Sequence, residues 1–330
     1  MFSQDKGFFS VDYHYLRPKD DEYGRLIGTS LDEFKNHVNF FMENFKMINL
    51  KNIFDFYYNQ ILIQNGLSIT FDDGLSDHYY AAKILYDNKI SGTFFVPSCI
   101  FSDKLPPNPT IIHYAIAIHG LKKFLNEYRI ILDELNLDIL RFDISYDKNL
   151  NDIWEVISNI KNIFKYKLDQ TVARKILLII FERLLVTTHN DIISHMHLTH
   201  EQIKEMLEMG HYVGAHTHTH ISIPPTIDTN YIEKELVFPT TIFKKIFNQK
   251  MYSFSYPYGD PNDCLSSKDL MNHTNQYKLA FTVENKFNTL ITSPLELGRY
   301  EVQRSDTITT LNHKLHKILT KYHEGSNIYK

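Results

Sequence analysis

The chain carries two adjacent carboxylates at the end of an apolar run, in the segment 67–74 with the sequence LSITFDDG. The pattern of this segment predicts a β-strand whose C-terminal end presents Asp72 and Asp73. Two ionised neighbours repel each other, and a cation beside them removes that conflict. One carboxylate can then bind the ion while the other handles a proton. The alternative is an Asp-Asp-Gly turn whose acids cap the following helix.

Histidines cluster in the segment 210–220, GHYVGAHTHTH. His216 and His220 are four residues apart, which lets both imidazoles face one ion across a helical turn, and in an extended chain His218 would share their face. Because the chain has 17 histidines, chance clustering is the alternative interpretation. One Asp with two His leaves coordination positions open for water and substrate, as a catalytic metal site requires.

These two segments resemble the polysaccharide deacetylases of carbohydrate esterase family 4, the nodulation-type deacetylase homology domain. The resemblance implies a divalent metal held by Asp73, His216 and His220, with Asp72 as the base. Zinc suits these ligands best, and nickel or cobalt would also fit. The resemblance also implies the fold class, which is α/β: a distorted (β/α)7-type barrel with a helical insertion.

Two further segments resemble the same family. Residues 90–96 (ISGTFFV) are similar to its next strand, and residues 253–259 (SFSYPYG) are similar to its third motif. By this resemblance, the backbone N–H at Tyr258 would help to hold the oxyanion of the reaction. With these segments, the resemblance covers most of the chain apart from a helical stretch in the middle.

The third motif departs from the family at one position. Many members carry an Arg there that orients the base, and Ser255 stands in its place here. The segment 297–302 (LGRYEV) resembles a late strand of members that supply an Arg from elsewhere. Arg299 is therefore the predicted partner of Asp72, and a structural or surface arginine is the alternative.

The general acid is expected from the N-terminal part of the chain. Family members usually take it from a late Leu-His motif, but the segment 311–316 (LNHKLH) reads as a solvated amphipathic helix. The segment 10–18 (SVDYHYLRP) resembles the Tyr-His segment that opens circularly rearranged members, in which the His is the acid. His14 is therefore the predicted acid. A packed or surface histidine is the alternative, with His313 or His316 next in line as the acid.

Strand and helix patterns alternate over residues 8–100, which predicts a parallel sheet or barrel. Ser30 and Glu33 form a capping box ahead of one of these helices. The pattern becomes helical over residues 105–198, and strand patterns return afterwards at 252–256, 279–283 and 297–302. We expect a single catalytic domain over residues 1–330, with a helical insertion at about 105–198.

Composition argues against several other classes of protein. The net charge of −4 gives no footprint for nucleic acid. No apolar stretch is long enough to span a bilayer, and the N-terminus has no apolar run of signal-peptide length. We therefore expect a cytoplasmic protein whose 330 residues, 43% of them hydrophobic, bury a large core. Cys99 and Cys264 are expected to be reduced, inert thiols.

The resemblance implies a hydrolase of carbon–nitrogen bonds other than peptide bonds, namely a metal-dependent deacetylase of an N-acetylated sugar. We expect a glycan precursor or an oligosaccharide as the carbohydrate substrate. The alternatives are a deformylase or an O-acetyl esterase acting on a sugar, a non-catalytic glycan-binding homologue, and a purely structural α/β domain. The helical insertion would cover the cleft or form the interface of a homo-oligomer.

Overall fold

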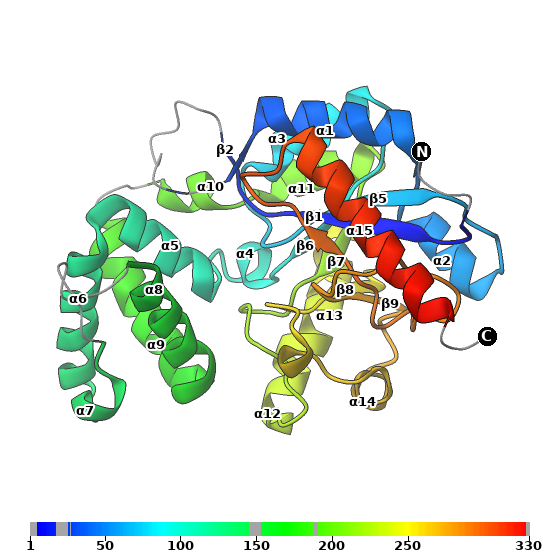
Figure 1. Ribbon diagram of the computed structural model, residues 1–330. Helices are drawn as coiled ribbons and strands as arrows, with labels where there is room; N and C mark the ends of the chain where they lie inside the picture. The colour runs from blue at the N-terminus through cyan, green and yellow to red at the C-terminus, as the bar shows by residue number, and fades with distance from the viewer. Residues whose placement is uncertain (1–4, 18–25, 27, 145–152, 188–190, 328–330) are drawn as a thin grey trace. The chain divides into compact units, whose positions relative to one another are not determined.

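The computed structural model describes the chain except for residues 1–4, 18–25, 27, 145–152, 188–190 and 328–330. The described residues form two compact units (Figure 1). The first unit draws on residues 1–19, 27–105 and 197–330, and the second on residues 20–26 and 106–196.

The first unit is built on an eight-stranded sheet in which every strand pair is parallel. Seven strands follow the order β10-β1-β5-β6-β7-β8-β9, and β4 also pairs with β5. These strands are β1 (Phe8–Tyr13), β4 (Lys46–Met47), β5 (Gly66–Phe71), β6 (Thr93–Val96), β7 (Tyr212–Ala215), β8 (Ser253–Ser255), β9 (Leu279–Phe281) and β10 (Tyr300–Glu301).

The last strand segment contacts both ends of this curled sheet. Leu297 forms a parallel bridge with Phe281 of β9, and three residues later Tyr300 pairs with Val11 of β1. The strand predicted at 297–302 is therefore split between two neighbours, which explains why β10 itself is so short. The α/β barrel class that the sequence predicted is confirmed.

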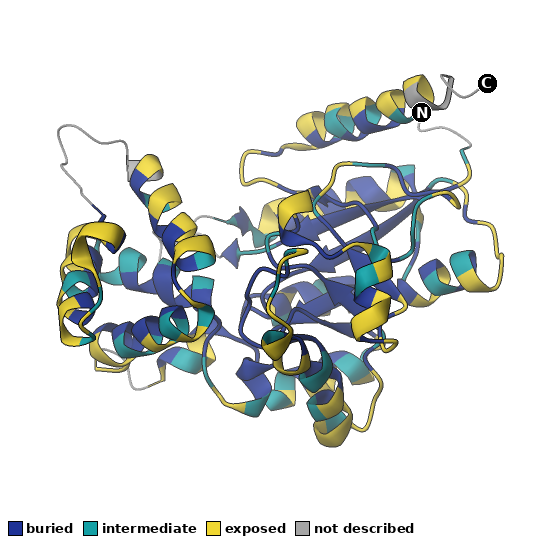
Figure 2. Cartoon of the chain, turned by 90° about the horizontal axis from the view of Figure 1, so that it is seen from below, coloured by how far each residue is buried: buried dark blue, intermediate teal, exposed yellow. Residues whose placement is uncertain are grey.

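Helices pack around the sheet. Figure 2 shows that the strands of the sheet are the buried layer of the first unit. Helix α1 contacts α3 and α15, and α3 contacts α11. The longer helices are α1 (Leu31–Asn44), α2 (Leu50–Tyr58), α3 (His78–Asp87), α11 (His200–Glu208), α13 (Phe238–Phe247), α14 (Ser267–His273) and α15 (Ile308–Asn327). Short elements complete the unit: β2 (Leu16–Arg17), β3 (Thr29–Ser30), α4 (Cys99–Ser102), α12 (Thr229–Ile232), η3 (Glu233–Val237) and η4 (Pro261–Asp263).

Local sequence signals explain the start of α1. Ser30 accepts a hydrogen bond from the backbone of Glu33, and the Glu33 side chain accepts one from the backbone of Ser30, so the predicted capping box is present. The helix then buries Phe34, Val38 and Phe41 against the sheet. This apolar face has the helical spacing that its sequence indicated.

Aromatic side chains hold neighbouring strands in register. Phe71 of β5 stacks on Phe94 of β6 with ring centroids 4.5 Å apart, and Tyr13 of β1 stacks on Phe71 at 5.8 Å. Phe34 of α1 packs edge-on against both Tyr13 and Phe71. Such cross-strand contacts fix β1, β5 and β6 relative to one another, and with them the residues that follow each strand.

All the secondary structure described in the second unit is helical. Its apolar core includes Ile111, Tyr114, Phe124, Tyr128 and Ile176, all fully buried. The helices are α5 (Asn108–His119), α6 (Leu121–Glu134), α7 (Ile139–Phe142), α8 (Ile153–Asn162), η1 (Ile163–Lys167), α9 (Gln170–Ile180), η2 (Phe181–Val186) and α10 (Ile192–Met196). The organisation as one domain with an insertion at about 105–198 stays a prediction.

Two smaller expectations concern membrane-spanning helices and the two cysteines. No helix among the described residues combines the length and the hydropathy that a bilayer span requires. Cys99 and Cys264 are both buried and form no disulfide. Burial, assisted by neighbouring acids, raises the pKa of the Cys264 thiol to about 12, so this thiol stays protonated and unreactive at neutral pH.

Candidate active site

The candidate site lies at the C-terminal ends of the strands, where parallel barrels place their reactive groups. Asp72 and Asp73 follow β5, His216 follows β7, and Tyr258 lies in the loop after β8. The turn after β5 is tight: Asp73 has φ of 77° and Gly74 has φ of 59°. A Cβ on Gly74 would come within 2.8 Å of the Val96 side chain, so only glycine fits this turn.

Asp72 is held by a buried arginine. The Nη1 of Arg299 donates to Asp72 Oδ1 at 2.8 Å, and its Nη2 donates to Oδ2 at 2.7 Å, which is a two-pronged contact. Ser255 Oγ donates to the same Oδ2 at 2.9 Å. Burial alone would raise the pKa of Asp72, but the Arg299 guanidinium lowers it below its ordinary value. Asp72 is therefore an ionised carboxylate with a fixed orientation.

Arg299 is itself fully buried and uses its other donors as well. Its Nε donates to the Thr282 carbonyl at 3.0 Å, and its Nη1 also donates to Asp12 Oδ1 at 2.8 Å. One guanidinium thus serves two buried carboxylates. Burial and the nearby Asp72 raise the pKa of Asp12 to about 7, although Arg299 acts in the opposite direction. Sequence reasoning missed Asp12, whose signal was its position near the end of β1, two residues before His14.

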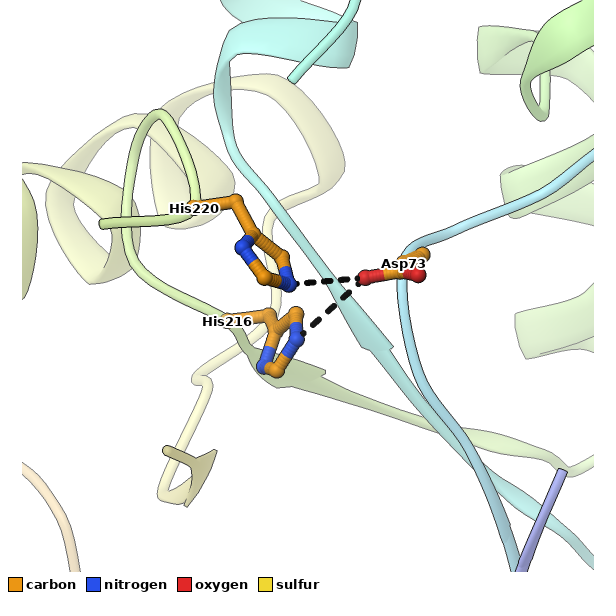
Figure 3. A group of neighbouring side chains, drawn as sticks. All are labelled: Asp73, His216 and His220. Carbon is orange, nitrogen blue, oxygen red and sulfur yellow. Dashed lines mark ion pairs between the residues drawn. The ribbon is translucent and has the colours of Figure 1, made fainter. Parts of the chain in front are cut away.

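The three predicted metal ligands lie together, as Figure 3 shows. Asp73 Oδ1 is 3.0 Å from His220 Nε2 and 3.4 Å from His216 Nε2. The Nδ1 of His216 lies 2.8 Å from the Ser255 carbonyl. Because a carbonyl only accepts, His216 donates from Nδ1 and turns the Nε2 lone pair towards Asp73.

A divalent cation fits this group of atoms. Asp73 Oδ1 is buried and has no hydrogen-bond partner among the described residues, and the same is true of His220 Nδ1. A carboxylate oxygen and an imidazole lone pair that face each other repel, and a cation between them turns the repulsion into ligation. One carboxylate and two imidazole nitrogens also form the type of donor set that leaves coordination positions open.

His14 lies beside these carboxylates with 33% of its side chain exposed. Its Nδ1 is 3.5 Å from Asp12 Oδ2 and 3.7 Å from Glu301 Oε1. Burial opposes the charged imidazolium, but the surrounding carboxylates, Asp12 foremost, raise the pKa of His14 to about 9. A cation held by Asp73 would cancel part of this effect. His14 is thus able to carry a proton at neutral pH. The pairing of β1 with β10 is what brings Glu301 to it.

Tyr258 contacts the metal-ligand group from the loop after β8. Its ring lies perpendicular to the imidazole of His220, with centroids 5.0 Å apart. Its backbone is left-handed, with φ of 66°. Tyr258 therefore lies next to the predicted ligand His220. The role of its backbone N–H in holding an oxyanion stays a prediction.

Three histidines that the sequence offered as alternatives lie outside the metal-ligand group. His218 points elsewhere: its Nδ1 is 2.8 Å from Ser98 Oγ, and its Nε2 is 3.1 Å from Asp103 Oδ2. Since Ser98 is fully buried, this Ser-His-Asp set presents no accessible nucleophile. His313 and His316 belong to α15, which packs its apolar face into the core as an amphipathic helix.

Comparisons with known proteins find a family match for part of this chain. The model of the polysaccharide deacetylase family matches residues 175–281, a segment that contains His216, His220 and Tyr258. A search of curated protein sequences found no match.

Solved structures of similar fold include IcaB from Ammonifex degensii, at 18% identity with a TM-score of 0.57, covering 94% of this chain and 98% of that one. The deacetylase PplD from Streptococcus pyogenes, in complex with acetate, has 14% identity and a TM-score of 0.55, covering 95% and 99%. A de-N-acetylase from Aggregatibacter actinomycetemcomitans has 13% identity and a TM-score of 0.53, covering 94% and 100%.

At sequence identities this low, the similarity to solved structures establishes the fold alone. The family model adds a sequence match over about a third of the chain. The resemblance that the motifs predicted is therefore confirmed: the chain has the fold of known deacetylases and matches the polysaccharide deacetylase family over residues 175–281.

Proposed function

We propose that this protein is a metal-dependent N-deacetylase that hydrolyses the acetamide of an N-acetylated sugar in a glycan precursor or oligosaccharide. One observation carries the proposal. Asp73 Oδ1 faces two imidazole nitrogens with no hydrogen-bond partner among the described residues, directly beside an Asp72 that Arg299 holds in place. A cation site next to an oriented carboxylate is the arrangement that hydrolysis of a carbonyl compound by activated water requires.

In this proposal Asp73, His216 and His220 hold a divalent ion, for which zinc suits the donors best and nickel or cobalt would also serve. When bound, such an ion polarises the carbonyl and makes water more acidic. Asp72 takes the proton of the attacking water. Its contact with Arg299 keeps it ionised and aimed, so that no reorganisation is needed during the reaction.

The leaving group determines the role of His14. An amine leaves poorly without a proton, so cleavage of an amide needs a general acid more than cleavage of an ester does. The raised pKa of His14 keeps this proton available at neutral pH. The backbone N–H at Tyr258 would share the charge of the tetrahedral intermediate, a contribution of about 10²–10³ in rate for one such donor.

Competing functions use the same residues. A deformylase or an O-acetyl esterase acting on a sugar would need the same cation site and the same base. A non-catalytic glycan-binding homologue is disfavoured because binding an ion would not require Asp72 to be fixed by Arg299 or His14 to be held in its protonated form. The predicted cytoplasmic location and homo-oligomer stay predictions.

The experiment that tests the proposal measures acetate and formate release from a panel of sugar nucleotides, chitooligosaccharides and O-acetylated sugars. Each reaction is run with protein that a chelator has stripped of metal, with the same protein after zinc is added, and with the Asp72→Asn variant as a matched control. We expect zinc-dependent acetate release from an N-acetyl sugar and none from the variant. Formate release alone would replace the deacetylase with a deformylase, and release that persists in Asp72→Asn would remove Asp72 from its role.

A further inference from the structure

The loop that carries two of the predicted ligands has an unusual backbone. Thr217 has φ of 57° and His220 has φ of 64°, both in the left-handed region. For residues with a side chain, this conformation costs roughly 1–2 kcal/mol each. The turn brings His220 back beside His216, and other contacts must hold the loop in it.

One contact is local, two come from the backbone of Ser98 and Cys99, and three come from a single side chain. Thr217 Oγ1 accepts a hydrogen bond from the backbone of His220 at 2.9 Å. The carboxylate of Glu235 accepts three more: its Oε2 from the backbone N–H groups of His218 and Thr219, each at 2.9 Å, and its Oε1 from Thr219 Oγ1 at 2.9 Å. Both residues between the left-handed ones thus donate to Glu235, while the carbonyls of Thr217 and His218 accept from the backbone of Ser98 and Cys99 at 3.1 and 3.0 Å.

Glu235 is suited to hold the loop because it lies in a buried, well-packed segment. Its side chain is only 2% exposed. The next residue, Leu236, is fully buried, and its carbonyl accepts a hydrogen bond from Tyr277 at 2.6 Å. The two oxygens of a carboxyl group can accept several hydrogen bonds at once. The buried Glu235 carboxylate therefore stabilises the turn between His216 and His220.

We propose that Glu235 is a positioning residue for the metal site: it holds the 216–220 loop in its left-handed turn, so that His216 and His220 both face Asp73 before a cation binds. The proposal rests on the proposed function in one respect, namely that these three residues bind a divalent ion. Without this tether of three hydrogen bonds to Glu235, the 216–220 loop would be less ordered before a cation binds. Ordering His220 would then cost free energy during binding and lower the affinity for the metal.

Two substitutions separate the shape of this tether from its charge. Glu235→Gln keeps the shape: the amide oxygen can accept both backbone N–H groups, and the amide NH₂ can donate to Thr219 Oγ1 if that hydroxyl reverses its hydrogen bond. Glu235→Ala removes all three contacts. A tether that acts through geometry is therefore rescued by Gln and lost in Ala.

The test titrates the metal-stripped, full-length protein with zinc and, for its visible spectrum, with cobalt. We expect Glu235→Ala to bind zinc about 10–100-fold more weakly, the usual effect of losing a partner that orients metal ligands. Glu235→Gln should stay close to wild type, and its cobalt spectrum should be unchanged. The readout is metal affinity, so it does not depend on turnover.

A matched control distinguishes positioning from general destabilisation. Asp306 is another buried carboxylate that anchors a loop, accepting from Tyr300 at 2.6 Å and from the Gln303 backbone at 2.9 Å. Asp306→Ala should lower the free energy of unfolding while leaving zinc affinity unchanged. If Glu235→Ala does not fold, Thr219→Val removes one of the three contacts and should still weaken zinc binding.

Each outcome decides the proposal. Wild-type zinc affinity in Glu235→Ala, or in Thr219→Val if that variant replaces it, overturns the proposal. So does a loss in Glu235→Gln as large as that in Glu235→Ala, because the geometric tether would then be wrong. An equal loss in Asp306→Ala overturns it as well. Failure of the proposed function looks different: the wild-type protein would then bind no divalent ion at all.

Discussion

Asp72 and Asp73 are adjacent in the chain but meet opposite surroundings. The two oxygens of Asp72 accept hydrogen bonds from both ends of the Arg299 guanidinium and from Ser255. Asp73 Oδ1 accepts none from the described residues and instead faces the Nε2 atoms of His216 and His220. One carboxylate finds its hydrogen-bond partners within the protein, whereas the Oδ1 of its neighbour fits the cation of the proposed function.

The difference follows from the turn between the two residues. Asp73 and Gly74 are left-handed, so the chain reverses direction and sends consecutive side chains to different partners. In the proposed function Asp72 moves a proton and needs a fixed geometry before substrate arrives, which Arg299 supplies. In the same proposal Asp73 needs an oxygen lone pair directed at the cation, and its Oδ1 accepts no hydrogen bond from the described residues.

The strongest test of this contrast exchanges the carboxylates for amides one at a time. Asp72→Asn should keep metal content near wild type and lower turnover by about 10²–10⁴, the usual range for a general base, because an amide cannot accept the proton of water. Asp73→Asn should lose both metal and turnover. Metal analysis alongside acetate release checks both variants. Loss of the metal in Asp72→Asn would remove the distinction between the two residues.

His14 should respond to the leaving group. His14→Ala is expected to lower the rate on an N-acetyl sugar by about 10²–10⁴, as is typical for a general acid, and to lower it far less on an aryl acetate, whose leaving group needs no proton. Bound metal should persist. Equal losses on both substrates would indicate a structural role, and an unchanged amide rate would move the acid to His313 or His316.

Arg299 should matter for stability as well as for rate. Arg299→Ala leaves Asp72 and Asp12 buried without their shared counter-charge, and breaking such a buried pair costs about 3–5 kcal/mol. Denaturant unfolding of the metal-free protein measures this loss. An unchanged unfolding midpoint and rate would show that Arg299 does not hold the base in place of the arginine absent at Ser255.

Zinc should stabilise the folded chain only through the predicted ligand Asp73 and its two histidine partners. At a concentration of 100 times its Kd, a ligand that binds only the native state adds about 2.7 kcal/mol to the free energy of unfolding. We expect the rise in Tm on adding zinc to be present in Asp72→Asn and absent in Asp73→Asn. A rise in Asp73→Asn as large as in wild type would place the ion elsewhere.

The smallest expected effect concerns pH. A general acid must be protonated, so activity should fall as pH rises through the pKa of His14, which neighbouring carboxylates hold above its ordinary value. Glu301→Gln removes one of these charges, lowers the pKa of His14 and moves this fall in kcat/KM to lower pH. Because Glu301 is 47% exposed, solvent screening should keep the shift below about one pH unit and high salt should reduce it further. A shift to higher pH would contradict this assignment.

Much of the site was predictable because its signals are local. The Asp-Asp-Gly turn and the His216–His220 spacing each lie within a few residues of the chain. The partners were harder to find. Asp12, Glu235 and Glu301 were missed because a lone acid in a strand or helix carries no local pattern, although each contacts a predicted loop or residue in the structure. Arg299 was found only through its resemblance to a late strand.

By itself, the sequence determined which groups can do chemistry here and on which kind of element they sit, because strand periodicity and turn residues act over short distances. Tertiary structure alone decided how they combine. The parallel pairing of β1 with β5 and β10 sets Asp12 and His14 beside Arg299, Glu301 and the Asp72 turn. Such contacts depend on which strands become neighbours, and that is settled by packing of the whole barrel rather than by any single segment.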